Sequence, residues 1–196
     1  ELFVKCLEEE GVEYIFGVPG EENNDFLIAL DDSPIRFIMT RHEQGAAFMA
    51  DAYGRITGKV GVCLSTLGPG ATNLVTGVAN ANMDHSPVLV ITGQGDSHRL
   101  HKESHQAMDV VGLFDPITKW AHSVYEPENI PEMIHKAIRL AEREKPGASH
   151  IELPENIAKQ PVEGTPFNPK KVRRPVPDDK VVDQAMQIIR SAKRPI

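Results

Sequence analysis

The chain has 196 residues, of which 40% are hydrophobic and 25% charged. These values predict one globular domain with a short additional segment and exclude a wholly disordered chain. The formal net charge is −7, which disfavours nucleic acid as a partner. The clearest apolar run, residues 88–91, is far shorter than the ~18 residues that cross a membrane, so no membrane partner is expected.

Strands and helices are predicted to alternate along the chain. Short apolar runs bounded by Gly or Pro indicate strands, and apolar residues at helical spacing indicate the helices between them. In chain order we expect a helix at 1–10, a strand at 14–18, a helix at 22–30, a strand at 35–39, a helix at 42–56, a strand at 60–64, a helix at 71–83, strands at 87–92 and 120–125, a helix at 130–144 and a strand at 149–153.

This alternation predicts an α/β fold with three layers, α/β/α, around a mostly parallel central sheet. The strand at 87–92 is apolar throughout, as expected when helices cover both faces of a parallel sheet. Between it and residue 108 the sequence is polar and is expected to be irregular. Cys6 and Cys63 both lie in apolar stretches, which predicts two buried, reduced thiols in a cytoplasmic protein.

The composition changes at residue 154, where six prolines within residues 154–177 indicate an extended linker. The predicted boundaries are a domain at 1–155, a linker at 156–177 and the start of a second domain at 178–196. The linker carries a basic cluster at 170–174. The last segment predicts a helix with its apolar face buried: Val181, Val182, Ala185, Met186 and Ile189. Because the first residues already have a helical pattern, we expect a piece of a longer chain.

The sequence Gly-Pro-Gly-Ala-Thr-Asn at 68–73 follows a predicted strand and begins a helix. Glycines there let a ligand approach the backbone, and free N–H groups at the helix start attract anions or polar ring atoms. A dinucleotide-binding turn would have glycine in place of Asn73 and an acidic residue at the end of the strand at 87–92. A nucleotide-binding module is therefore disfavoured, while a tight turn in which Asn73 serves only the backbone stays open.

Glu43 is expected in the first turn of the helix at 42–56, where the helix dipole stabilises a carboxylate. If this helix start faces a pocket, the carboxylate can hold or relay a proton; otherwise it only supports its helix. His98, His101 and His105, with Asp96 nearby, have spacings that would suit a metal on a helix. The neighbouring glycines argue against so rigid a scaffold, and no metal ligand is predicted.

Four motifs in this order resemble the N-terminal, pyrimidine-binding domain of thiamine-diphosphate-dependent enzymes, in particular the acetolactate synthase group. They are Ile15-Phe-Gly-Val-Pro-Gly20, Arg41-His-Glu-Gln-Gly-Ala46, Gly68-Pro-Gly-Ala-Thr-Asn73, and His105-Gln106 followed by Thr118-Lys119-Trp120. The resemblance covers about residues 1–155. It implies the thiamine-diphosphate-binding fold and, for a full-length protein, the conversion of two pyruvate molecules to 2-acetolactate and CO₂.

The resemblance also implies roles for single residues. Glu43 matches the glutamate that hydrogen-bonds N1′ of the aminopyrimidine ring and thereby favours the tautomer that accepts the proton of the thiazolium ring. Gln106 matches a glutamine that reaches the reacting centre. The catalytic residues expected are thus Glu43 and Gln106, and the cofactor-binding residues are Pro19, Gly20, Glu43, Pro69 and Asn73.

Further components are implied outside these residues. The family holds Mg²⁺ and the diphosphate on a C-terminal domain through a Gly-Asp-Gly turn, whereas here Gly95-Asp96 is followed by Ser97. The cofactor lies between two chains, which implies a homodimer or homotetramer and an inactive isolated domain. FAD is left open, because His105-Gln106-Ala107 looks more like the catabolic enzymes, which do not need it, than like the Phe-Gln-Glu of biosynthetic ones.

Two alternative functions remain beside acetolactate synthesis from pyruvate. A 2-oxo acid decarboxylase or oxidase of the same family would share every motif and differ in what reacts after CO₂ has left. A catalytically inactive homologue used for assembly is the second alternative, and the presence of Glu43 argues against it. Glu43 also argues against the glyoxylate-specific carboligases of the family, which lack this glutamate.

Overall fold

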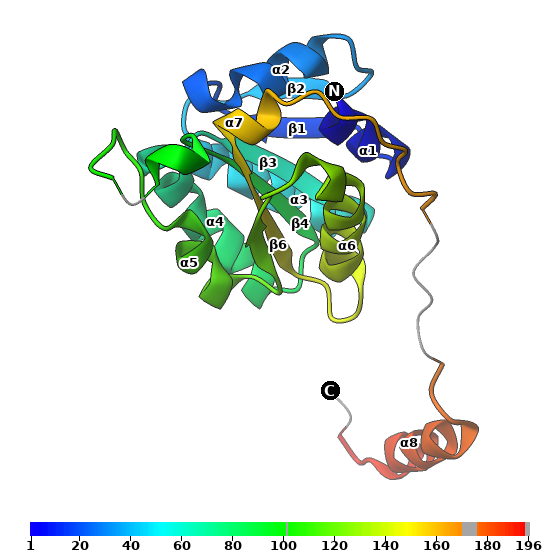
Figure 1. Ribbon diagram of the computed structural model, residues 1–196. Helices are drawn as coiled ribbons and strands as arrows, with labels where there is room; N and C mark the ends of the chain where they lie inside the picture. Colours follow the sequence, from blue (N-terminus) through cyan, green and yellow to red (C-terminus); the bar gives the residue numbers. More distant parts are fainter. Residues whose placement is uncertain (101, 170–175, 195–196) are drawn as a thin grey trace.

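A computed structural model describes residues 1–100, 102–169 and 176–194 (Figure 1). At its centre is a six-stranded sheet with the order β2-β1-β3-β4-β6-β5, in which every pairing is parallel. The strands are β1 (Tyr14–Gly17), β2 (Arg36–Met39), β3 (Gly61–Ser65), β4 (Val88–Gln94), β5 (Ala121–Ser123) and β6 (Ala148–Pro154).

Helices cover both faces of this sheet, which confirms the predicted three-layer α/β/α fold. One face is covered by α1 (Leu2–Glu9), α2 (Asn24–Asp31), α6 (Ile130–Glu142) and α7 (Glu155–Ala158). The other is covered by α3 (Glu43–Thr57), α4 (Pro69–Met83) and α5 (Val110–Phe114). Short 3₁₀ turns complete the connections: Glu21–Asn23, Ser97–Arg99, Asp115–Ile117 and Pro127–Asn129.

The two faces bury separate apolar clusters, and β4 contributes to both. Leu89 and Ile91 pack with α1 and α6, while Val88 and Val90 pack with α3, α4 and α5. Alternate side chains of a strand point to opposite faces, so a central strand between two helical layers favours apolar residues at successive positions. This arrangement accounts for the unbroken apolar run that the sequence shows at 88–91.

The predicted strands and helices are all present, with bounds that differ by a few residues. Two short helices, α5 and α7, were not expected from the sequence. Ile157 of α7 is buried, and Gly164 lies against Leu2, so residues that follow β6 pack on the surface of the domain. The basic cluster at 170–174 lies outside the described residues.

One prediction about the last helix, α8 (Asp179–Ser191), is wrong for the described part of the chain. Its apolar face was expected to be buried, but Val181 and Ile189 are 57% and 56% exposed, and Val182, Ala185 and Met186 are exposed too. The amphipathic pattern correctly predicts the helix, but burial also needs a covering element, and none of the described elements covers this face. None of the described helices is long and apolar enough to cross a membrane.

Both cysteines are buried and free, as predicted. Burial raises the pKa of the Cys6 thiol to about 11 and that of the Cys63 thiol to about 12. Both side chains therefore stay protonated at neutral pH, and a protonated, buried thiol is chemically inert.

Helix α3 lies so close to β3 that the strand begins with a glycine. A Cβ on Gly61 would overlap the carbonyl oxygen of Ala50 and crowd its carbonyl carbon at 2.7 Å. Those are backbone atoms, which cannot move away without shifting the helix. We expect Gly61→Ala to lower the free energy of unfolding by about 3 kcal/mol, as overpacking of a core does, measured by urea unfolding of the full-length protein.

Gly45, a residue of α3 itself, provides the control, because nothing lies within 4 Å of a Cβ placed there. Since alanine is the better helix former, Gly45→Ala should leave the stability unchanged or raise it slightly. Equal unfolding midpoints for the two variants would show that α3 does not press on β3 as described.

Candidate functional site

The candidate site lies at the carboxyl ends of β1 and β3, in the middle of the sheet (Figure 1). From β1 the chain moves outward to β2, and from β3 it moves the other way to β4. Ligands of open α/β sheets bind where the connections diverge in this manner, because the loops separate and leave a crevice. The predicted site residues come from the loops and helix starts around this point.

The turn after β1 contains Pro19 and Gly20 and packs on the turn after β3. Pro19 is exposed. A Cβ on Gly20 would overlap the methyl group of Thr66, so a larger residue there would require Thr66 to move. The backbone N–H of Gly20 donates to Oδ1 of Asn23 over 3.0 Å, and Asn23 is buried. The two turns thus pack directly against each other, because Gly20 has no side chain.

The turn after β3 is shaped by Gly68, whose φ of +53° lies in the left-handed region that favours glycine. A Cβ there would lie 2.6 Å from the carbonyl oxygen of Gln106 and 2.9 Å from its Cβ. Pro69 follows as the first residue of α4, where the missing N–H costs nothing, and its ring is exposed. Gln106 is therefore brought to the Gly68 turn from 38 residues further along the chain.

Glu43 is the first residue of α3, and its side chain reaches across to the start of α4. Nδ2 of Asn73 donates to Oε2 of Glu43 over 2.9 Å. On the other side, a Cβ on Gly70 would lie 3.4 Å from Oε1 of Glu43. The half-buried carboxylate thus sits between the N-terminal ends of two helices, whose dipoles both favour its negative charge.

These contacts decide one of the alternatives left by the sequence. Asn73 does not serve only the backbone, because its side chain binds Glu43. Three of the predicted residues belong to one continuous group: Gly20, Glu43 and Asn73. Glu43 contacts Asn73 and lies beside Gly70. Gly70 in turn lies against Thr66, which packs on Gly20, since a Cβ on Gly70 would be 2.7 Å from Oγ1 of Thr66. Gln106 joins this group through Gly68, with its side chain exposed.

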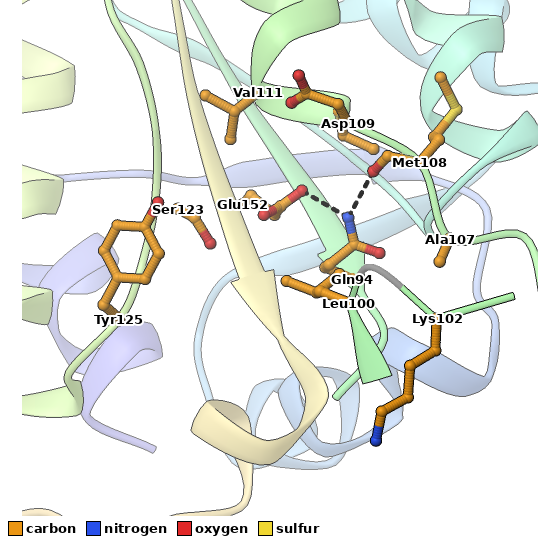
Figure 2. Close-up of a pocket in the computed structure, with 11 residues that line it drawn as sticks. Gln94, Leu100, Lys102, Ala107, Met108, Asp109, Val111, Ser123, Tyr125 and Glu152 are labelled. Carbon is orange, nitrogen blue, oxygen red and sulfur yellow. Dashed lines mark hydrogen bonds between the residues drawn. The ribbon is translucent and has the colours of Figure 1, made fainter. Parts of the chain in front are cut away.

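A second group of polar side chains, not predicted from the sequence, lies at the carboxyl ends of β4, β5 and β6 beside a cavity of about 450 Å³ (Figure 2). Nε2 of Gln94 donates to Oε2 of Glu152 over 2.9 Å and to the carbonyl oxygen of Met108 over 3.0 Å. Ser123 also hydrogen-bonds the carboxyl group of Glu152, whose pKa is raised by burial. Gln94 and Glu152 are only 2% and 4% exposed.

A sequence signal for this second group does exist. Gln94 ends the strand that begins with the apolar run at 88–91, and Glu152 lies between Ile151 and Leu153 in another, near the end of each strand where ligands bind in parallel sheets. A buried carboxyl group is costly unless it is hydrogen-bonded, so an acidic residue between two apolar residues of a predicted strand indicates a specific partner. The sequence does not say which partner that is.

The histidine-rich stretch does not form a metal centre among the described residues, where no group of three or more His, Cys, Asp or Glu side chains is placed to hold an ion. Asp96 instead begins a 3₁₀ turn by accepting from the backbone N–H of His98 over 2.8 Å. His101 lies outside the described residues.

The comparisons with known proteins agree with this geometry. Residues 1–113 match the family described as "Thiamine pyrophosphate enzyme, N-terminal TPP binding domain". A "Probable acetolactate synthase large subunit" of Methanocaldococcus jannaschii is 45% identical over 98% of the chain and 33% of its own length.

Two further relatives are similar along the whole chain. One from Methanococcus aeolicus, also a "Probable acetolactate synthase large subunit", is 41% identical over 34% of its length. The other, an "Acetolactate synthase, catabolic" of Raoultella terrigena, is 41% identical over 35% of its length. The chain thus spans about a third of the length of the curated relatives it matches.

Proposed function

The chain belongs to the thiamine pyrophosphate enzyme family as an N-terminal TPP-binding domain, and from this premise we propose that its full-length protein is an acetolactate synthase. It would convert two pyruvate molecules and one proton to 2-acetolactate and CO₂. The names of the relatives support this reaction. The observation in the structure that carries it is the Glu43–Asn73 pair between the starts of two helices.

The site fits the aminopyrimidine ring of thiamine diphosphate. Gly20, Gly68 and Gly70 let the turns around Glu43 pack closely together, because a Cβ on any of them would meet a neighbouring protein atom within 3 Å. This packing holds the Glu43 carboxylate in one place, where the ring could bind. A carboxylate pairs well with a ring nitrogen that carries a proton. Glu43 would hold that proton, and the hydrogen bond from Asn73 would keep the carboxylate oriented towards it.

The chemistry can be divided between the cofactor and these side chains. When bound, thiamine diphosphate supplies the carbon that adds to the 2-oxo group and takes up the electron pair left by CO₂. Glu43 contributes a proton-holding group at the ring nitrogen, and half-burial strengthens its electrostatic effect on the ring. Gln106, held against Gly68, would lie at the entrance used by the substrate.

We infer that the other components implied by the family belong to the rest of the full-length protein. Mg²⁺ would be held there with the diphosphate, and the question of FAD stays open. A homodimer or homotetramer is supported by apolar side chains exposed on α3, close to Glu43: Phe48 and Met49 are each 40% exposed. A cytoplasmic location is supported by the two free, buried thiols.

The deciding experiment uses the full-length protein with pyruvate, thiamine diphosphate and Mg²⁺, and measures all products. We expect 2-acetolactate and CO₂ in a ratio of about one to one, as the stoichiometry demands. Acetaldehyde as the main product would assign the protein to the decarboxylases, and acetate formed with consumption of an oxidant would assign it to the oxidases. The absence of product from pyruvate and every other 2-oxo acid would contradict the proposal.

A further inference from the structure

Gln94, Glu152 and Met108 form a link between the centre of the sheet and the stretch that carries Gln106. Gln94 is the last residue of β4, and Ser123 of β5 is paired in register with Glu152 of β6. Figure 2 shows these side chains converging beside the cavity, with the amide of Gln94 between Glu152 and Met108 and with Lys102 extending away from them. Three neighbouring strands thus contribute to one hydrogen-bonded group.

Both ends of the Gln94 side chain are used, which determines its orientation. Its Oε1 accepts from the backbone N–H of Gly95 over 3.0 Å, while Nε2 donates to Glu152 and to the carbonyl oxygen of Met108. If the amide turned over, its oxygen would face the acceptor oxygens of Glu152 and Met108, and all three hydrogen bonds would be lost. Glu152 therefore acts on Met108 through Gln94.

The stretch around Gln106, which Gln94 contacts through Met108, contains a residue in an unfavourable backbone conformation. We call residues 102–109 the Gln106 segment. Gln106 has a φ of +54°, a conformation that costs a residue with a side chain about 1 kcal/mol or more. It persists only where the surroundings hold it, and Met108, two residues on, is bound to Gln94. On the other side of the residue, Gly68 provides the space into which the Gln106 carbonyl and Cβ fit.

We propose that Gln94 and Glu152 are positioning residues that hold the Gln106 segment against the Gly68 turn; the catalytic part of this inference rests on the proposed function. Burying the carboxyl group of Glu152 costs free energy that an apolar side chain of similar size would not, so packing alone does not account for it. Its value here is that it gives the Gln94 amide a further acceptor and so strengthens the orientation in which Nε2 faces Met108. In this role the pair acts through the position of Gln106 rather than by contact with substrate or cofactor.

The first test measures kcat and KM for pyruvate in the full-length protein. We expect Gln94→Leu, which removes the donor to Met108, to lower kcat about tenfold or more and to leave KM within about twofold, because a misplaced group weakens transition-state interactions rather than binding. Glu152→Gln keeps an oxygen acceptor for Gln94 and should retain kcat within about threefold, while Glu152→Leu should resemble Gln94→Leu.

A double variant tells positioning from independent action. If Gln94 acts through Gln106, Gln94→Leu combined with Gln106→Ala should have the same kcat as Gln106→Ala alone. Ser149→Ala is the matched control, because Ser149 is a fully buried residue of β6 whose hydroxyl donates to Ala137 on the opposite face. It loses one buried hydrogen bond and should leave kcat unchanged. Effects of Gln94→Leu and Gln106→Ala that multiply would overturn the proposal.

A second readout does not depend on activity. Hydrogen exchange of backbone amides in the Gln106 segment, measured on the full-length protein without cofactor, should become faster in Gln94→Leu and Glu152→Leu and stay unchanged in Glu152→Gln and Ser149→Ala. Unchanged exchange in Gln94→Leu would overturn the proposal whatever the enzyme does. A protein that makes no product from any 2-oxo acid would instead contradict the proposed function, and the exchange data would still decide the positioning role.

Discussion

Glu43→Gln is expected to lower kcat for 2-acetolactate formation by the full-length protein about 10²- to 10⁴-fold, the usual contribution of a positioned acid or base. The amide has nearly the same shape as the carboxylate, and its oxygen can still accept from Nδ2 of Asn73. It carries no negative charge, however, and so it cannot stabilise a proton on the ring nitrogen that Glu43 is proposed to bind. The loss should therefore appear in kcat, with the fold and its stability preserved.

The measurement is a titration with thiamine diphosphate at saturating pyruvate, with product formation as the signal. Glu132→Gln is the matched control, since Glu132 is an exposed acid in the first turn of another helix, α6. It loses the same charge at the same kind of position and should keep its activity within about twofold, because a first-turn acid alone contributes only ~0.3–1 kcal/mol of helix stability. Activity of Glu43→Gln within threefold of the unmodified protein would exclude the proton-holding role.

The second large effect concerns stability in acid and arises from His150. This residue of β6 is fully buried, stacks on Phe114 with 4.4 Å between ring centroids, and has its Nε2 2.9 Å from the hydroxyl of Thr92. Within the described residues, its Nδ1 has no hydrogen-bond partner. Burial lowers the pKa of the imidazole to about 3, so His150 stays neutral in the folded protein at any pH at which proteins normally work.

The sign of the effect follows from proton binding in the two states. In the unfolded chain this histidine is protonated below its ordinary pKa of about 6.5. In the folded chain it is protonated only below about pH 3. Above pH 6.5 the imidazole is unprotonated in both states, and His150 has no influence on the pH dependence. As the pH is lowered from about 6.5 to about 3, the free energy of unfolding falls by about 1.4 kcal/mol per pH unit, to a total loss of roughly 5 kcal/mol.

Urea unfolding of the full-length protein at about pH 7.5, 6 and 4.5 would measure this dependence. His150→Gln cannot be protonated and can still hydrogen-bond Thr92, so its stability should fall less steeply over the same range. The exposed His122 of the neighbouring strand provides the control, and His122→Gln should keep the steep dependence of the unmodified protein. Identical slopes for His150→Gln and the unmodified protein would mean that this imidazole is not held neutral by burial.

Several parts of this molecule follow from local chemistry and were predicted from the sequence. The apolar run at 88–91 predicts a strand covered on both faces, because a parallel sheet between two helical layers leaves no polar face. Gly58, with φ of +70°, ends α3, as expected for a left-handed helix terminus. The motifs around Gly20, Glu43 and Gly68 predict a ligand site, since each combines a loop or helix start with residues that suit close approach or charge.

Other parts depend on contacts between residues far apart in the chain. Glu43 and Asn73 are 30 residues apart and Gln94 and Glu152 are 58 apart, and nothing within either stretch specifies its partner. They meet because parallel strands bring their carboxyl ends to one edge of the sheet. The burial of His150 has the same origin, since a single polar residue in a strand does not reveal which helix will cover it.

The sequence alone therefore determines the order of strands and helices, the three layers, and the turn and charge chemistry at residues 19–20, 43 and 68–73. These properties depend on backbone preference and on the periodicity of apolar residues, which act over a few positions. The tertiary structure decides that Asn73 binds the Glu43 carboxylate, that Gln94 and Glu152 hold the Gln106 segment, and that the apolar side of α8 is uncovered. Those outcomes depend on which surfaces meet, and a hydrogen-bonding group or an apolar face is compatible with many partners until the packing of the sheet selects one.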